Sequence, residues 1–338
     1  MRIKFGFGIG DLGGNLFFTI IGFYLLYFLT DVVELAAGLA GTAMMIGKFW
    51  DAVTDPAVGY LSDRTTHRMG RRRPYIFYGS FILLVSMVIM FTDPGLSSQR
   101  LLFVWAALAY CLLNTAYTLV NIPYTSLLPE LTRDYHQRTV LAGYKMSFAV
   151  VGTLVGASAV LPVADLLPDP RLGWALMGGV MGGIMLATAM TTFALIREPY
   201  GSPSTEKSGF LSSYANAFRS KPFLLVLIPN VLHMTGVTII QGALLYYFAY
   251  IFQARDLFRF ALLFLLLSSI IFIPLWVLFS KRIGKKYSYN AGMTLLTLII
   301  ILFFATSHSQ PVSYSYVLLA IGGIGFATHY VMPHALMP

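Results

Sequence analysis

Residues 36–73 read AAGLAGTAMMIGKFWDAVTDPAVGYLSDRTTHRMGRRR, and this stretch joins the two features that decide the fold. An apolar run as long as the ~20 residues that a helix needs to cross the hydrocarbon core leads into a short basic connection. The whole chain of 338 residues is 57% hydrophobic and only 11% charged, whereas about 25% of an ordinary soluble domain is charged. The mean hydropathy is +0.73. These proportions predict an integral membrane protein.

Ten apolar segments are long enough to span a bilayer. Backbone groups find no water to bond inside the hydrocarbon, so we expect each segment to be an α-helix and the fold class to be all-α. The predicted spans are 13–30, 36–60, 74–92, 101–122, 140–162, 173–195, 223–252, 258–279, 288–306 and 314–336.

The connections between these segments alternate in charge. Those on one side hold 17 of the 23 Lys and Arg residues, including five in the connection that follows the second span. Those on the other side hold four, Arg100, Arg171, Arg255 and Arg259. Because basic connections stay on the cytoplasmic side, this distribution predicts a cytoplasmic amino terminus.

The longest polar stretch predicts the domain organisation. Residues 197–221 follow six spans, so we expect an amino-terminal six-helix bundle at 1–196, a cytoplasmic linker at 197–221 and a second bundle at 222–338. A faint echo of the basic turn after span two recurs after span eight, and two six-helix halves are a common transporter plan. The second half shows four spans. We therefore expect a truncated chain with about ten of twelve helices.

Several functional classes are disfavoured by the residues themselves. The net charge of +9 does not indicate a nucleic-acid partner, because the basic residues lie between spans on one side of the membrane. Cys111 is the single cysteine, so disulfides and thiol metal sites are excluded. No Walker A sequence is present, which argues against ATP as the direct energy source. Residues 8–13, GIGDLG, match GxGxxG without a preceding strand, so we assign them to close helix packing or a flexible helix start.

Charged side chains inside a span are the clearest functional signal. Of the acidic residues, Asp51 and Asp55 lie well inside span two, whereas Asp11 lies at the end of span one. Lys48, Asp51 and Asp55 project from one helical face because they are three and four residues apart. The pair predicts a site for a sodium ion or an exchangeable proton. The alternative is a structural Lys48–Asp51 ion pair, with Asp55 near Pro56.

Further polar groups fall at a similar depth. Thr118 and Asn121 lie near the inner end of span four, and Lys145 lies about two turns into span five, so these groups could meet at one level. Lys145 could equally extend to the cytoplasmic interface. Tyr24 and Tyr117 could stack on a sugar ring, although most aromatic residues in such a chain face lipid or pack.

These segments resemble a known family. GFGIGDLGGNLFFTIIGFYLLYFLTDVV at 6–33, KFWDAVTDPAVGYLSDRT at 48–65, MGRRRPY at 69–75 and YTLVNIPYTSLLPELT at 117–132, followed by HQRT, are similar in order and spacing to the glycoside–pentoside–hexuronide:cation symporters, the group of the bacterial melibiose permease. The resemblance covers the amino-terminal half well and the carboxyl-terminal half more loosely. It implies a major facilitator fold and cation-coupled symport by alternating access.

The resemblance also implies residue roles. In that family the paired aspartates of span two bind the coupling cation with a threonine of span four, which corresponds to Asp51, Asp55 and Thr118. Thr54 stands where the family commonly has Asn. The motif of the following turn controls the change between inward-open and outward-open states. It corresponds to Gly59, Asp63, Arg64, Gly70 and Arg71, and we group Lys48 with these gating residues.

Departures from the family affect the substrate site. Asn15, Asn121 and Lys145 stand where the melibiose permease has two aspartates and an arginine that contact the sugar, and Thr125 replaces a tryptophan. Tyr330 occupies the position of a family aromatic residue in span ten. Asn still bonds hydroxyls but lacks the charge-assisted strength of a carboxylate. The cation site therefore carries over from the resemblance, whereas galactoside specificity does not.

These observations together predict a secondary transporter. We expect a sugar, glycoside or uronide as the solute, with a lipid-like or other organic solute as the alternative, and no cofactor beyond the coupling Na⁺ or H⁺. An integral-membrane enzyme would need a nucleophile–base pair or metal cluster, and the sequence offers none. A non-transporting sensor is a third possibility. The resemblance implies a monomer that spans the bacterial inner membrane several times.

Overall fold

The computed structural model describes residues 1–132, 134–198, 221–306 and 309–336, which form two compact units, Met1–Thr205 and Glu206–Pro338. Each unit is described by itself. The predicted linker at 197–221 falls almost wholly outside the described residues, so the predicted domain bounds stay predictions. The first unit contains α1 (Arg2–Phe23), α2 (Leu25–Tyr27), η1 (Phe28–Val32), α3 (Ala37–Arg64), α4 (Arg73–Met90), α5 (Gln99–Thr125), α6 (Leu128–Leu131), α7 (Tyr135–Ala164) and α8 (Pro170–Leu195).

The second unit is also helical. Its elements are α10 (Lys221–Tyr246), the π-helix η2 (Tyr247–Ile251), the short 3₁₀ turn η3 (Arg255–Leu257), α11 (Phe258–Ile283), α12 (Lys285–Thr306) and α13 (Val312–Leu336). Within the part of the chain that the structure describes there is no β-strand. The all-α prediction is confirmed.

Eight of the ten predicted spans each fall on one long helix of the described residues. The span at 13–30 covers α1, α2 and η1, and the span at 223–252 covers α10 and η2. Eight of these helices are both long and apolar enough to cross a membrane. The two others that were predicted to span are α3, which carries Lys48, Asp51 and Asp55, and α13, of which only Val312–Thr328 counts as a shorter apolar helix. A charged face on α3 is expected if that helix lines a polar path rather than facing lipid.

The predicted start of the first span is wrong. The first helix begins at Arg2 and not at residue 13, and its apolar span runs over Arg2–Phe23. The glycine-rich residues 6–14, which precede most of the predicted span, lie inside this helix and pack closely on its neighbours. The prediction that Asp11 lies at a span end is therefore also wrong. Asp11 lies near the middle of α1 and is 9% exposed.

The glycines of α1 allow its neighbours to approach closely. A Cβ atom at Gly8 would lie 2.7 Å from the Phe148 ring, and one at Gly13 would lie 2.7 Å from Thr188 Oγ1. The contact is closest across α7, where a Cβ at Gly152 would lie 2.2 Å from the Leu12 carbonyl oxygen. The assignment of the GxGxxG sequence to close helix packing is thus confirmed.

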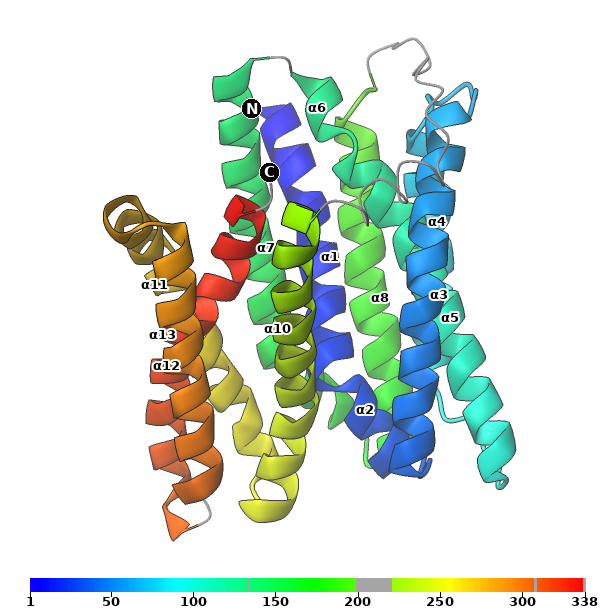
Figure 1. The fold of residues 1–338 in the computed structure, drawn as a ribbon. Coiled ribbons are helices and arrows are strands. Elements are labelled where there is room, and N and C mark those ends of the chain that lie inside the picture. Colours follow the sequence, from blue (N-terminus) through cyan, green and yellow to red (C-terminus); the bar gives the residue numbers. More distant parts are fainter. Residues whose placement is uncertain (133, 199–220, 307–308, 337–338) are drawn as a thin grey trace. The chain divides into compact units, whose positions relative to one another are not determined.

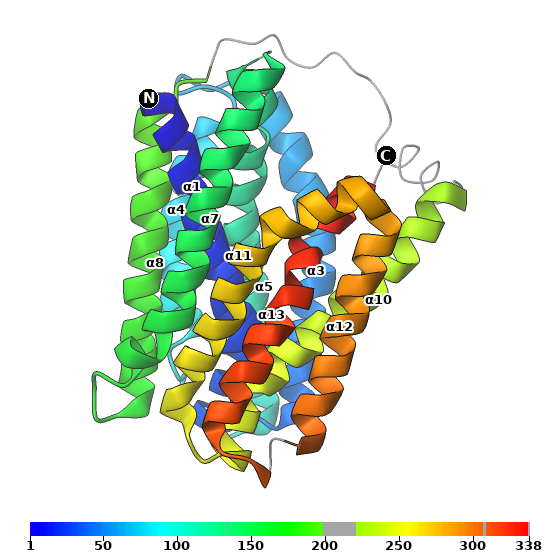
Figure 2. The same ribbon diagram turned by 90° about the vertical axis from the view of Figure 1, so that its left-hand side faces the viewer.

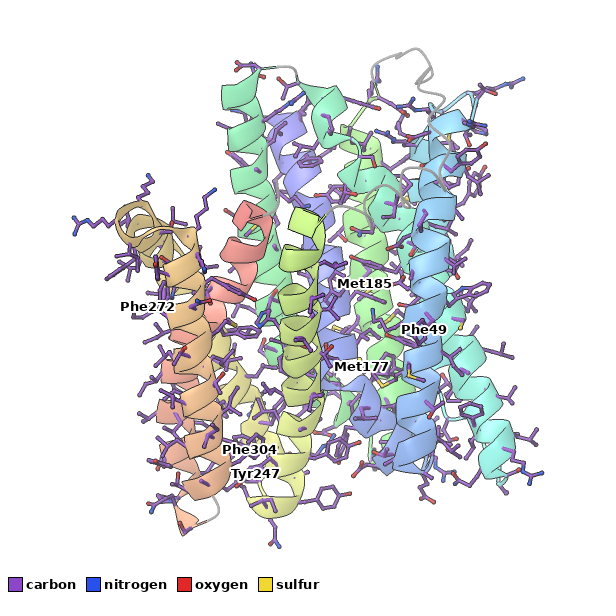
Figure 3. All side chains as sticks on the ribbon, viewed as in Figure 1. Phe49, Met177, Met185, Tyr247, Phe272 and Phe304 are labelled. Carbon is purple, nitrogen blue, oxygen red and sulfur yellow. The ribbon has the colours of Figure 1, made fainter. Side chains whose placement is uncertain are left out.

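Helix contacts in the first unit centre on α1, which packs against α7 and α8, while α3 packs on α5 and α4 packs on both α5 and α8 (Figures 1 and 2). The rings of Phe28 and Phe91 lie 5.4 and 6.0 Å from that of Trp174, and all three are buried. Met177 and Met185 of α8, labelled in Figure 3, are buried as well. Apolar side chains thus fill the space between these helices.

In the second unit α13 packs against both α11 and α12. Ser269 of α11 donates a hydrogen bond to the Gly323 carbonyl at 2.9 Å, and the Trp276 indole donates to the Ile324 carbonyl at 2.7 Å. Tyr247 lies edge to face with Phe304 at 5.2 Å (Figure 3). Polar bonds to helix backbone thus join two of these helices where lipid supplies no partner.

We predict that Gly152→Ala lowers the melting temperature of the detergent-purified protein. The new methyl group would overlap the Leu12 carbonyl, and overpacking of this kind costs about 1–3 kcal/mol. Gly143→Ala on the same helix is the matched control, because nothing lies within 4 Å of a Cβ there. Alanine favours a helix over glycine by roughly 0.5–1 kcal/mol, so this control should melt at the same or a higher temperature. Equal melting of the two variants would contradict the close contact between α1 and α7.

Candidate functional site

Asp51 and Asp55 of α3 meet Thr118 of α5 in the first unit. Thr118 Oγ1 lies 2.7 Å from Asp55 Oδ1 and 3.3 Å from Asp51 Oδ1. Thr118 is 1% exposed, so its hydroxyl lies in the protein interior. The packing of α3 on α5 sets this geometry, since the two carboxylates follow each other by one turn on the face that α5 covers. The structure thus brings three of the predicted cation-site residues together.

One hydroxyl cannot satisfy both carboxylates at once. A threonine has a single O–H hydrogen to donate, so one of the two short oxygen–oxygen approaches lacks a proton whenever both aspartates are ionised. A cation bound to these oxygens, or a proton on one carboxyl, would remove the conflict. The described residues hold no group of three or more His, Cys, Asp or Glu side chains that could bind a metal ion. The donor set is therefore two carboxylates and a hydroxyl, which are hard oxygen ligands.

Lys48 approaches the pair from the preceding turn of α3. Its Nζ atom lies 3.6 Å from Asp51 Oδ2, whereas Asp51 Oδ1 faces Thr118. The Lys48 side chain is 53% exposed and that of Asp51 is 24% exposed. The ion pair of the structural alternative and the threonine contact of the cation-site interpretation are thus both present, on different oxygens of one carboxylate.

A second charged cluster joins α1 to α7. Lys145 Nζ lies 3.5 Å from Asp11 Oδ1, and Asn15 Nδ2 donates to Asp11 Oδ2 at 3.1 Å and to the Asp11 carbonyl at 3.0 Å. The Lys145 ammonium also lies 5.8 Å from the centre of the Tyr124 ring. Lys145 therefore points to an aspartate inside the unit in this structure. Sequence reasoning missed this pair, since Asp11 was placed at the end of a span.

Asn121 and Tyr117 lie beside a small cavity within the first unit. The Tyr117 ring stacks on Phe17 at 4.1 Å, and its hydroxyl faces α1 at Gly14. The cavity is mostly apolar, with Asn121 among its few polar side chains. It is lined by Gly10, Gly13, Gly14, Ile76, Leu83, Tyr117, Val120, Asn121, Tyr124, Met185, Thr188, Ala189 and Thr192.

Three predicted site residues lie apart from these clusters. Tyr24 is fully buried, and its hydroxyl donates to the Ala157 carbonyl at 3.0 Å, so it fastens α1 to α7 and we leave it out of the proposed binding site. Thr54 donates to the Asp51 carbonyl at 3.3 Å within its own helix rather than to a carboxylate. The side chain of Tyr330 lies outside the described part of the chain.

Three of the predicted gating residues, Asp63, Gly70 and Arg71, lie at the end of the unit where α3 turns into α4, whereas Lys48 lies beside Asp51. Arg72 NH2 lies 2.6 Å from Asp63 Oδ1, and Arg72 NH1 lies 2.7 Å from Glu130 Oε1. Arg71 pairs with Glu130 and lies 3.7 Å from Glu198 Oε1.

The turn that carries these arginines has a fixed backbone. Gly70 adopts φ of +110°, which favours glycine, and a Cβ there would meet the Glu198 carboxylate at 2.5 Å. The neighbouring Arg72 amide donates to the same carboxylate at 2.9 Å.

Other members of the predicted gating group lie outside this network. Arg64 is exposed and stacks on the Tyr60 ring at 4.0 Å, and Gly59 faces Ile122 at an ordinary contact distance. Sequence reasoning missed Arg72, Glu130 and Glu198. The only available signal was the presence of isolated acidic residues at the ends of spans four and six, on the same predicted side as the arginine run.

Comparisons with known proteins agree with this architecture. The family described as MFS/sugar transport protein matches residues 6–338. The chain is 30% identical over 328 residues to the uncharacterized symporter YnaJ of Bacillus subtilis, covering 95% of this chain and 71% of that protein. It is 28% identical to the isoprimeverose transporter of Lactiplantibacillus pentosus, covering 86% and 62%.

A vertebrate protein is similar over almost the whole chain. The sodium-dependent lysophosphatidylcholine symporter 1-A of Danio rerio is 25% identical, with 99% of this chain and 69% of that protein covered. The first curated relatives are thus spanned over between 39% and 71% of their own length.

Solved structures agree on the fold. The nucleoside transporter NupG superimposes with a TM-score of 0.69 over 99% of this chain and 80% of its own, at 13% identity. A family match over nearly the whole chain, together with the helical architecture, identifies a multi-pass membrane protein that belongs to the MFS/sugar transport family, a family of transporters and not of enzymes.

Proposed function

We propose that this protein is a secondary transporter in which a monovalent cation, Na⁺ or H⁺, drives symport of a sugar, glycoside or uronide by alternating access. The contact that carries the proposal is the shared approach of Asp51 and Asp55 to the Thr118 hydroxyl. On this proposal the amino terminus is cytoplasmic, as the unequal distribution of Lys and Arg predicts.

The balance of charge in the two clusters, Asp51–Asp55–Lys48 and Asp11–Lys145, supports a single coupling cation. Three carboxylates, those of Asp11, Asp51 and Asp55, lie along α1 and α3, whereas Lys48 and Lys145 supply only two ammonium groups near them. One positive charge is missing, and an uncompensated charge inside a membrane is costly. A bound Na⁺ or an added proton supplies that charge at Asp51 and Asp55. Binding of the cation and of the solute then favour each other by the same factor, because such coupling is reciprocal.

The Asp11–Lys145 cluster is our candidate for the solute contact. Asp11, Asn15 and Asn121 accept or donate hydrogen bonds of the kind that sugar hydroxyls make, and Lys145 can bond hydroxyls or a carboxylate. A uronide would pair its carboxylate with Lys145 and release Asp11 to bond hydroxyls. Tyr117 and Tyr124, beside the same helices, offer ring faces for the apolar side of a sugar.

A lipid-like solute is the second candidate. The vertebrate relatives named for lysophosphatidylcholine cover nearly the whole chain. In addition, Asn15 and Asn121 stand at the two positions where the melibiose permease has aspartates that contact the sugar. A phosphate group would suit Lys145 as well as a carboxylate does.

We predict that Asp51→Asn and Asp55→Asn each abolish the stimulation of uptake by the coupling cation, because either change removes the negative charge that the cation compensates. Thr118→Val should raise the cation concentration that gives half-maximal stimulation roughly tenfold, which is the effect of losing about 1–1.5 kcal/mol of bonding. Thr118→Ser keeps the hydroxyl and serves as the control. The measurement is uptake into proteoliposomes against Na⁺ concentration and pH. Cation dependence that persists in both aspartate variants would refute the site.

For the second cluster, Asp11→Asn and Lys145→Met should each lower the melting temperature of the solute-free protein, since each leaves the partner charge buried and unpaired. Breaking a buried pair costs about 3–5 kcal/mol, and the partial exposure of Lys145 places the expected loss at or below the lower end of that range. The double variant should recover part of the loss. A fully additive double variant would show that the two charges do not interact.

The two solute classes can be separated by a binding screen. We expect glucuronides or glycosides to raise the melting temperature in the presence of Na⁺ and Lys145→Met to remove the rise for uronides. Lysophosphatidylcholine in mixed micelles is the competing ligand. A rise with the lysolipid and none with any sugar would favour the second candidate.

A further inference from the structure

Two buried side-chain oxygens without a hydrogen-bond partner in the described chain lie one and two turns before Thr118 on α5. Tyr110 and Asn114 are each 1% exposed. Among the described residues, Tyr110 Oη and Asn114 Oδ1 have no hydrogen bond of ordinary geometry. A buried oxygen without a partner costs about 1–3 kcal/mol, so a donor that reaches these two atoms would be stabilised there.

The backbone of α3 fixes both side chains. Asn114 Nδ2 donates to the Gly47 carbonyl at 3.3 Å, so the amide oxygen is the free end. The Tyr110 ring lies flat against Gly47, where a Cβ would lie 2.1 Å from Tyr110 Cδ1, and only glycine permits this approach. Lys48 is the next residue. The Tyr110 hydroxyl already lies near Lys48 and the Asn114 side chain, at a geometry looser than that of an ordinary hydrogen bond.

The Lys48 ammonium group, in turn, lacks close acceptors for its hydrogens among the described residues. An ammonium group has three hydrogens to donate and accepts none. The Tyr110 hydroxyl can turn its own hydrogen toward Asn114 Oδ1, but the lone pairs of Tyr110 Oη then still lack a donor, which Lys48 can supply. The only ion pair of Lys48 in the described chain is the one with Asp51, at 3.6 Å, which is longer than a hydrogen bond. The Lys48 side chain is 53% exposed, so its long stem is free to turn between neighbouring acceptors.

We propose that Tyr110 and Asn114 form a second acceptor site for the Lys48 ammonium, which alternates between them and Asp51. When the cation site is empty, Lys48 neutralises Asp51. When a cation binds Asp51, Asp55 and Thr118, Lys48 moves onto Tyr110 Oη and Asn114 Oδ1. The inference rests on the proposed cation site. Lys48 then competes with the coupling ion, and the two α5 acceptors reduce the cost of displacing it.

Sodium binding to the detergent-purified full chain tests this exchange, measured with radioactive Na⁺ and by the Na⁺ concentration that gives half the thermal shift. Asn114→Leu and Tyr110→Phe should each weaken Na⁺ binding about three- to tenfold, the loss of one hydrogen bond to a charged group. Lys48→Met should strengthen binding several-fold because the competing ammonium is gone. In the Lys48→Met background, Asn114→Leu should change the affinity less than twofold.

Matched variants exclude simpler explanations. Thr115→Val removes a neighbouring α5 hydroxyl that bonds Trp50 and not Lys48, so it should leave the sodium affinity unchanged. Tyr110→Phe removes one oxygen atom and keeps the ring, which maintains the test if Asn114→Leu fails to fold.

The results separate this inference from the proposed function. Unchanged sodium affinity in both Asn114→Leu and Tyr110→Phe, or an equal loss in the Lys48→Met background, overturns the exchange while the cation site stands. Sodium binding that survives in Asp51→Asn and Asp55→Asn overturns the cation site itself. A wild-type protein without saturable sodium binding overturns the sodium form of both.

Discussion

An ionised side chain in the hydrocarbon core needs a partner of opposite charge, and the interior of the first unit is arranged around that requirement. An unpaired charge at the middle of a membrane helix costs roughly 2.5–3.5 kcal/mol on insertion scales. Asp11 meets it with Lys145, and Asp51 meets it with Lys48 and Thr118. Both arrangements depend on helices that approach closely. Gly152 of α7 lies against Leu12 of α1 in the first case, and Gly47 of α3 lies against Tyr110 of α5 in the second.

The close packing of helices and the pairing of charged side chains therefore depend on the same glycines in this bundle. The glycines that let α7 approach α1 also bring Lys145 within 3.5 Å of Asp11. The glycine that admits the Tyr110 ring also sets Lys48 beside two unsatisfied oxygens. The proposed cation site, with its two carboxylates and one hydroxyl, is left one charge short. On that proposal the ion can be released in each transport cycle, because no permanent partner replaces it.

At the α3–α4 turn, two arginines are surrounded by three carboxylates. Arg71 and Arg72 bond Asp63, Glu130 and Glu198, which come from three separate parts of the first unit. Arg72 and Glu198 are buried in this network, so removing one partner would leave a poorly solvated charge without its pair. Breaking the network would release the ends of α3, α6 and α8 from one another, which is the type of change that the proposed alternating access requires.

The sequence by itself determined the membrane class, the helical fold and the positions of nearly all spans, because lipid requires long apolar helices and the pattern of such runs is local. It also located Asp51, Asp55 and Thr118, since a charge within an apolar run stands out and helical spacing is regular. Only the tertiary structure decided the start of α1, where the glycine-rich residues 6–14 are held in the helix against its neighbours, and hence the burial of Asp11. It alone paired Lys145 with Asp11, Arg72 with Glu130 and Lys48 with the neighbourhood of Tyr110. Those contacts depend on which helices pack together, and that depends on long-range shape that no local pattern records.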